Sequence, residues 1–364
     1  MVLNYAVVGY GPRSRGVMRA LQGKMNLIAG FDPSEDAKEK LLAKNVNVPE
    51  SYEDLLELDE LDAVLIGSPP QFHAPQAIAA LEHDLHVFSE VPMAIKEENV
   101  QKILDADESS PKAKYMLGEN AAFHAEVIYA AHLVESGKLG PTVYCETEYL
   151  HDVSYRWRGR NISNYKQNEP KKHWYALFDP LMYAHAILPA QVAMGGYKNP
   201  MRFSEVFSYG NKIGGENGKP VCEPAFSFQV GLFKSKTGAI AKCASCYVFA
   251  RKPTRYICQV VGRFGTYESY EKGGTGYQYM CDGFNISRGN RAGKGKKIRK
   301  WHLNKVANLL KGNTSRVVTE WVKCIEKGEK PVFDSSIAAN VTMAGIASSE
   351  SARTGKTVDI PTYD

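Results

Sequence analysis

A glycine-rich turn near the N-terminus has the residue types that hold a pyrophosphate. Residues 9–14, GYGPRS, follow the apolar segment Leu3–Val8 and precede a helical pattern. Gly9 permits a tight turn, Gly11 lets the backbone approach a phosphate, and Ser14 allows close packing of helix on strand. The free N–H groups at the helix start and the positive end of its dipole would stabilise the phosphate charge.

A carboxylate stands where a dinucleotide would need one. Asp32 ends the second apolar segment, Leu27–Phe31, 23 residues after Gly9. It would accept hydrogen bonds from the hydroxyls of the adenosine ribose and repel a 2′-phosphate, so the sequence predicts NAD and not NADP. The alternative is a glycine turn in an α/β domain that binds no nucleotide.

Apolar segments alternate with helical patterns through the first 120 residues. The predicted strands are Leu3–Val8, Leu27–Phe31, Ala63–Ile66, His86–Phe88 and Lys114–Leu117. The predicted helices are Val17–Leu21, Tyr52–Leu58, Pro75–Leu81 and Asn99–Asp105. Repeated units of this kind predict an α/β fold, with a doubly wound parallel sheet covered by helices on both faces.

The pattern changes after about residue 140, where strands follow one another with few helices between them. They are Val143–Leu150, Phe203–Tyr209, Ala225–Phe233, Ala239–Val248, Arg255–Val261 and Thr266–Glu271. This order favours an open, largely antiparallel sheet with one covered face. Two further helices are predicted at about 315–326 and 335–352.

Composition bounds the class of protein. A chain of 364 residues with 23% charged residues predicts two globular domains and excludes disorder. The net charge of +5 is concentrated between Arg288 and Lys300, which we interpret as an exposed loop and not as a nucleic-acid site. The seven scattered cysteines, the absence of a leader-like N-terminus and the lack of a long apolar run predict a cytoplasmic protein that does not enter a membrane.

Further motifs follow the glycine turn in a characteristic order: residues 68–74 (SPPQFHA), 89–94 (SEVPMA), 118–120 (GEN) and 349–361 (SESARTGKTVDIP). Together they resemble the glucose–fructose oxidoreductase/inositol dehydrogenase/MocA family over nearly the whole chain. The resemblance implies a Rossmann domain at 1–120 and an α/β domain at 121–364 that binds substrate, with C-terminal helices that can pack back on the first domain. It also implies hydride transfer between NAD(P) and sugars or polyols, in a homo-oligomer formed through the C-terminal sheet.

The glycine turn and the family motifs together predict the residues that contact NAD. They are Gly9, Gly11, Pro12, Arg13, Ser14, Asp32, Ser68, Pro69, His73, Glu90, Pro92 and Asn120. No metal site is predicted, because the pair Cys243 and Cys246 has no partner at zinc spacing and its members would lie on opposite faces of a strand.

One departure from the family concerns proton transfer. Most members carry Glu-Lys-Pro where this chain has Glu90-Val91-Pro92. The family lysine orients the substrate hydroxyl and helps to move its proton, and valine can do neither. Either the protein is not a dehydrogenase, or another residue handles the proton.

The substitution, together with residues 148–152 (EYLHD) and 181–185 (LMYAH), is similar to a branch of the family that acts on glycosides. That branch includes NAD-dependent α-N-acetylgalactosaminidases and glycoside 3-dehydrogenases. The similarity places catalytic roles on Glu119, Tyr149 and His185. It leaves the role of Tyr183 open, and a later tyrosine matches either Tyr256 or Tyr267.

His185 has the chemistry to replace the lysine, because a neutral imidazole can take a proton from a sugar hydroxyl near neutral pH. It lies in an apolar stretch, Ala176–Met194, that we interpret as helical. Each of the three residues could instead have a purely structural role. His185 could pack between helix and sheet, Tyr149 could be an ordinary tyrosine of the sheet, and Glu119 could cap a helix.

Two neighbouring segments are weaker candidates for substrate contact. His151 and Asp152 could pair, with the carboxylate fixing the imidazole tautomer, or could simply end a strand. Residues 155–158 (YRWR) combine aromatic rings with guanidinium groups, which suits a sugar, a pyrophosphate or an oligomer interface.

The sequence therefore predicts an NAD-dependent oxidoreductase that transfers hydride between nicotinamide and a ring carbon of a sugar or glycoside, C3 by the family similarity. One alternative is a glycosidase that uses bound NAD for transient oxidation at C3, followed by elimination and hydration. Another is an NAD-binding sensor that has no catalytic activity.

Overall fold

The computed structural model describes residues 2–153, 177–212, 224–248, 255–269, 276–280, 296–298 and 312–364. The chain divides into two compact units. Unit 1 comprises Met1–Asn120, Gly312–Thr342 and Tyr363–Asp364, and unit 2 comprises Ala121–Lys311 and Met343–Thr362. The basic segment 288–300, apart from 296–298, and residues 155–158 lie outside the described residues.

The sheet of unit 1 is parallel, and its described strands lie in the order β2-β1-β3-β4-β5. The strands are β1 (Asn4–Val8), β2 (Asn26–Phe31), β3 (Ala63–Ile66), β4 (His86–Ser89) and β5 (Tyr115–Leu117). Every residue of β3, β4 and β5 is buried, as expected for strands covered on both faces. The predicted parallel sheet is therefore confirmed.

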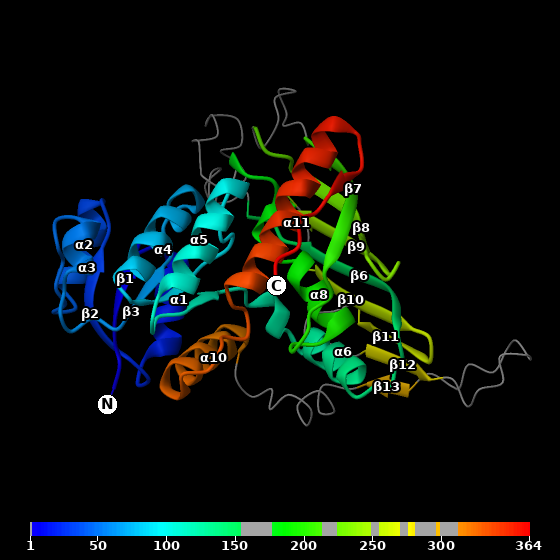
Figure 1. Ribbon diagram of the computed structural model, residues 1–364, viewed down its shortest axis with the longest axis horizontal. Helices are drawn as coiled ribbons and strands as arrows, with labels where there is room; N and C mark the ends of the chain where they lie inside the picture. Colours follow the sequence, from blue (N-terminus) through cyan, green and yellow to red (C-terminus); the bar gives the residue numbers. More distant parts are fainter. Residues whose placement is uncertain are drawn as a thin grey trace, which may run out of the picture. The chain divides into compact units, whose positions relative to one another are not determined.

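Helices surround this sheet (Figure 1). They are α1 (Pro12–Leu21), α2 (Glu35–Leu42), α3 (Tyr52–Leu56), α4 (His73–Glu82), α5 (Glu97–Ser109) and α10 (Asn313–Lys327). The short helix α2 was not predicted. Helix α1 begins at Pro12, earlier than the predicted Val17, because proline is favoured in the first helical turn. Helix α10 packs on α1, and its buried Trp321 meets Phe88 of β4 with ring centroids 5.2 Å apart.

Unit 2 is built on a mixed sheet whose described strands lie in the order β13-β12-β11-β10-β6-β9-β8-β7-β14. Strands β6 and β9 pair in parallel and the other pairs are antiparallel, so the predicted largely antiparallel sheet is confirmed, although its parallel pair was not predicted. The strands are β6 (Thr142–Leu150), β7 (Phe203–Asn211), β8 (Phe228–Ser235), β9 (Ile240–Cys246), β10 (Arg255–Gly262), β11 (Gly265–Ser269), β12 (Gly276–Met280), β13 (Lys296–Ile298) and β14 (Val358–Asp359).

Helices cover one face of this sheet, which we call the covered face (Figure 1). They are α6 (Ala125–Glu135), α8 (Ile187–Gly195) and the part of α11 (Ser335–Thr354) that belongs to unit 2. Alternate residues of β6, Cys145 and Thr147, point to the covered face and are buried. Helix α6 was not predicted.

None of the helices in the described part of the chain is long and apolar enough to cross a membrane.

His86 gives unit 1 a measurable dependence of stability on pH. Burial, assisted by the charge of Lys112, lowers the pKa of His86 to about 4, and Nδ1 accepts a hydrogen bond from the Lys114 N–H at 3.2 Å. Between about pH 4 and pH 6.5, His86 therefore binds a proton in the unfolded chain and remains neutral in the folded chain. The free energy of unfolding should be fully present above pH 6.5 and should fall by up to about 3 kcal/mol as the pH approaches 4.

The His86→Asn variant should lose this dependence, because asparagine keeps an acceptor oxygen and does not titrate. Urea unfolding of both proteins between pH 7.5 and pH 4.5 measures the difference. Parallel pH profiles for the two proteins would contradict the assignment.

Candidate functional site

The glycine turn has the geometry that its sequence predicts. Gly9 has a φ of +83°, and a Cβ there would lie 2.6 Å from the backbone nitrogen of Ser68. Gly11 is the N-cap of α1, and the space where its Cβ would stand is open. Ser14 is fully buried, and a Cβ on Gly67 would come within 2.2 Å of its hydroxyl oxygen. The turn is thus closely packed at Gly9 and open at Gly11, the N-cap of α1. Open space at the start of a helix fits a pyrophosphate.

Asp32 lies at the end of β2 beside this turn. Its Oδ2 accepts a hydrogen bond from the Tyr10 N–H at 2.8 Å, and its Oδ1 accepts one from the Ser34 N–H at 2.9 Å. These two bonds fix the carboxylate and leave lone pairs for further donors. Because Asp32 remains partly exposed, it can accept from ribose hydroxyls.

His73 ties together two of the predicted cofactor loops. Its ring nitrogens lie 2.8 Å from the carbonyl oxygens of Pro92 and Ser68, and its side chain is buried. Burial lowers the pKa of His73, so the ring is neutral near pH 7 and donates through one nitrogen only. Pro92 is buried as well, whereas Ser68 and Pro69 are partly exposed. His73 therefore positions the loops on which the exposed residues stand.

A network of polar side chains around Arg13 joins the glycine turn to the residues that follow β4 and β5. The Nε of Arg13 donates to Oε1 of the buried Glu90 at 2.8 Å. Thr314 of α10 accepts from both Arg13, at 3.2 Å, and the side-chain amide of Asn120, at 3.0 Å. Sequence reasoning missed Thr314, because 194 residues separate it from Asn120 and 301 separate it from Arg13. Val91 is buried and offers no group for proton transfer.

Glu119 follows β5 at the carboxyl end of the parallel sheet, the edge at which ligands of such folds bind. Its side chain is fully buried. The remaining predicted catalytic residues, Tyr149 and His185, belong to unit 2.

Tyr149 and His185 lie against each other at the end of the covered face. Their rings are stacked with centroids 4.4 Å apart and 29° between the planes. Tyr256, opposite Tyr149 on the neighbouring strand β10, meets it edge-on at 5.2 Å. Tyr149 and His185 are both partly exposed, so a substrate can reach them.

Two histidines extend this cluster. Nδ1 of His151 lies 3.2 Å from the hydroxyl of Tyr149. His124, the N-cap of α6, packs edge-on against Tyr256 with centroids 4.3 Å apart, and its Nδ1 lies 3.6 Å from Oε1 of the buried Glu126. Sequence reasoning missed His124, because nothing in its spacing relates it to a strand that lies more than a hundred residues later.

The other tyrosines named from the sequence lie elsewhere in unit 2. Tyr183 is buried and packs edge-on against Tyr247 at 5.9 Å. Tyr267 is fully buried and packs against Tyr129 at 5.0 Å. Of the two candidates for the later tyrosine, the structure brings Tyr256 to Tyr149 and His185.

The helix predicted over Ala176–Met194 is wrong at His185. Residues Pro180–Tyr183 form one 3-10 turn, η5, and α8 begins only at Ile187. Ala184 between them has a φ of +64°, a left-handed conformation that ends the turn. His185 therefore stands in a loop just before a helix.

Cys243 and Cys246 lie on opposite faces of β9. Cys243 is opposite Thr147 on the covered face, whereas Cys246 is opposite Leu150 and its thiol contacts the carbonyl of Val248 at 3.1 Å. In the part of the chain that the structure describes, no group of three His, Cys, Asp or Glu side chains could hold a metal.

The fold and the turn agree with comparisons to known proteins. Residues 3–118 match the oxidoreductase family with an NAD-binding Rossmann fold. This match confirms the family resemblance over that segment and the prediction of an NAD-binding unit.

Curated relatives match over 145 residues, 40% of this chain. A glycosyl hydrolase family 109 protein of Shewanella woodyi is 30% identical, and an α-N-acetylgalactosaminidase of Shewanella oneidensis is 32% identical. The match spans about a third of each relative, namely 30% and 31% of their lengths.

Solved structures resemble the whole chain. Levoglucosan dehydrogenase in complex with NADH has a TM-score of 0.79 at 18% identity and is covered over 100% of both chains. The WlbA dehydrogenase of Bordetella pertussis, in complex with NADH and UDP-GlcNAcA, has a TM-score of 0.75 at 15% identity, with 99% of this chain and 98% of that chain covered. At these identities the likeness confirms the fold.

Asp32 should set the affinity and the choice of dinucleotide. The Asp32→Ala variant should bind NADH about tenfold to a hundredfold more weakly, because a charge-assisted hydrogen bond is lost, and should discriminate less against NADPH. Fluorescence titrations with both nucleotides measure this. Asp36→Asn, an exposed carboxylate of α2, is the matched control. Unchanged NADH affinity in the Asp32 variant, or a wild-type preference for NADPH, would refute the prediction.

Proposed function

We propose that this protein is an NAD-dependent oxidoreductase that acts on a ring hydroxyl of a sugar or glycoside. The observation that carries the proposal is the stacked pair of Tyr149 and His185, two partly exposed proton-transfer groups in a chain whose other unit has an NAD-binding fold. NAD, when bound, supplies the hydride acceptor.

Unit 1 holds the cofactor in this proposal. Gly9, Gly11, Pro12 and the start of α1 take the pyrophosphate, and Asp32 takes the adenosine ribose. Ser68, Pro69 and Asn120 offer partly exposed groups for the rest of the dinucleotide. Two buried residues keep these loops in place. They are Glu90, which accepts a hydrogen bond from Arg13, and His73, which lies between the carbonyls of Ser68 and Pro92.

Unit 2 handles the proton. As a carbinol becomes a ketone, its C–H leaves as hydride and its O–H proton passes to a ring nitrogen of His185. The hydroxyl of Tyr149 donates to or accepts from the same substrate. Tyr256 holds the ring of Tyr149 edge-on and so limits its rotation.

A second candidate is a glycosidase that oxidises its substrate transiently. The similarity to an α-N-acetylgalactosaminidase favours it, as does valine in place of the family lysine. In this reaction a ketone at C3 acidifies the C2 proton, the aglycone is eliminated, water adds and the hydride returns. No net NADH accumulates.

Replacement of His185 tests the proposal. His185→Gln should lower the rate of hydride transfer by about a hundredfold to ten-thousandfold and leave NADH affinity unchanged. The readout is absorbance at about 340 nm after glycosides, including levoglucosan and 4-nitrophenyl N-acetyl-α-galactosaminide, are added. His132→Gln, an exposed histidine of α6, is the control.

The same reactions separate the candidates. Net NADH formation supports the oxidoreductase. Aglycone release without net NADH, with deuterium at C2 of the substrate exchanged for solvent hydrogen, favours the glycosidase. A protein that binds NAD and turns over no glycoside of a broad panel would refute both.

The face of the unit 2 sheet opposite the helices, the open face, is proposed to be an interface between copies of this chain. The register places four exposed apolar side chains on it, from four strands: Tyr209, Leu232, Ile240 and Tyr277. Two ion pairs lie among them, Lys242 with Glu146 at 2.7 Å and Lys234 with Glu205 at 2.9 Å. Paired charges between apolar side chains suit a surface that becomes buried.

A charge at Leu232 should break this assembly. Leu232 is 51% exposed, and Leu232→Asp would bury an unpaired carboxylate in the interface. Light scattering should give a mass of two or more chains for the wild type and of one chain for the variant. Leu42→Asp, 58% exposed on α2, should keep the wild-type mass. A monomeric wild type, or an unchanged mass for Leu232→Asp, would contradict the proposal.

The protein is also proposed to act in a reducing compartment, the cytoplasm. The thiols of Cys145, Cys243, Cys258 and Cys324 are free and buried. Recovery of a disulfide between any of them from native cells would overturn this.

A further inference from the structure

The loop that carries His185 has little regular structure of its own. It lies between η5 and α8 and contains the left-handed Ala184. Nevertheless, Pro180, Leu181, Ala184 and Ala186 are buried, so the loop is held from within unit 2.

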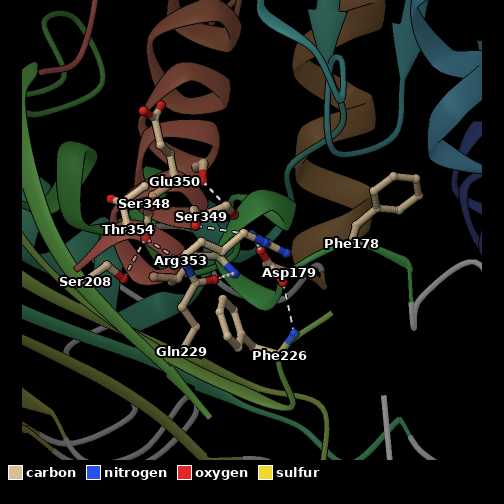
Figure 2. A network of polar contacts seen from close by, with 12 residues as sticks. Phe178, Asp179, Ser208, Phe226, Gln229, Ser348, Ser349, Glu350, Arg353 and Thr354 are labelled. Carbon is tan, nitrogen blue, oxygen red and sulfur yellow. Dashed lines mark hydrogen bonds and ion pairs between the residues drawn. The ribbon is translucent and has the colours of Figure 1, made fainter. Parts of the chain in front are cut away.

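One anchor is a buried ion pair at the start of the loop. Asp179, only 1% exposed, accepts a hydrogen bond through Oδ1 from the Phe226 N–H at 2.9 Å and pairs through Oδ2 with Nη1 of Arg353. Figure 2 shows Arg353 reaching from the end of α11 to Asp179. Its guanidinium also donates to the Ser349 carbonyl at 3.1 Å and lies over the ring of Phe226 at 5.0 Å.

Two further anchors act on the same loop. Oε1 of the buried Gln229 accepts from the Leu181 N–H at 3.1 Å, and its amide donates to Ser348 of α11 at 3.0 Å. At the other end, the hydroxyl of Thr147 donates to the Ala186 carbonyl at 2.7 Å. Helix α11 thus holds the loop before His185 and strand β6 holds it after.

We infer that Arg353 is a positioning residue for His185. It supplies the charge that keeps Asp179 buried, and Asp179 fixes where the loop to His185 begins. Without that charge, the carboxylate is left uncompensated and moves towards water, because a buried unpaired carboxylate is strongly disfavoured. The loop then shifts and His185 loses its stacking on Tyr149. The inference rests on the proposed role of His185.

The stacking itself provides a readout that needs no substrate. The ring current of Tyr149 displaces the NMR signals of the His185 ring protons. In protein labelled selectively at histidine, the signal that disappears in His185→Gln identifies them. In Arg353→Gln, these signals should move towards the values of a free histidine, whereas Arg353→Lys should restore part of the displacement because it keeps the charge.

Glu350→Gln is the matched control. Glu350 lies one turn before Arg353 on α11, and its side chain is exposed. It should leave the His185 signals unchanged. Thermal unfolding and NADH stoichiometry show whether each variant is folded. A wild-type His185 spectrum in folded Arg353→Gln overturns the inference. If Arg353→Gln does not fold, Arg353→Lys carries the test, and His185 signals at the values of a free histidine in that folded variant, which keeps the charge, overturn the inference.

Kinetics separate this inference from the proposed function. With the glycoside that the wild type oxidises, Arg353→Gln should lower kcat by about tenfold to a hundredfold with little change in KM, and the solvent isotope effect should rise as proton transfer becomes slower. A loss of folded protein would leave the isotope effect unchanged. Loss of activity in His185→Gln with a wild-type rate in Arg353→Gln overturns the inference alone. Full activity in His185→Gln overturns the proposed function first.

Discussion

Strand β6 alternates between two environments, and its register against β9 and β10 decides which side chains lie in each. Cys145, Thr147 and Tyr149 point to the covered face, whereas Tyr144 and Glu146 point to the open face. A slip of one residue would exchange the two sets. The same register therefore aligns Tyr149 with its neighbour on β10, directs the Thr147 hydroxyl to the loop before α8, and presents the paired charge of Glu146 on the opposite surface.

In unit 1 the corresponding constraint is that backbone segments approach one another so closely that only glycine fits between them. Gly9 and Gly67 stand where a Cβ would collide with Ser68 and Ser14. The turn can therefore lie directly on the sheet, with its open side available for a phosphate. His73 extends this arrangement, because its buried neutral ring lies between the loops after β3 and β4 and donates to one of their two carbonyls without exposing a charge.

Local patterns predicted the first unit well because parallel buried strands are short apolar runs, and Ala63–Ile66 is such a run. Helix α6 was not predicted, because it is apolar around most of its circumference and its sequence shows little helical periodicity. The candidate site was predicted only in part. Tyr149 and His185 were named from motifs, but the partner Tyr256 comes from a strand paired across more than a hundred residues, and the left-handed Ala184 depends on tertiary contacts. Neither feature has a local signal in the sequence.

The proposed function needs a group that moves a proton, and the buried Val91, where most members of the family that the sequence resembles carry lysine, offers none. A lysine needs a desolvated site before it can give up its proton near neutral pH, and burial would then also hold it in place. The proposed function gives the proton to His185, a partly exposed side chain that stacks on Tyr149. A partly exposed side chain on a loop is positioned only in part by its own packing, here the stacking on Tyr149. The position must come from groups that hold the loop at both ends, and Asp179 with Arg353 at one end and Thr147 at the other are groups of that kind.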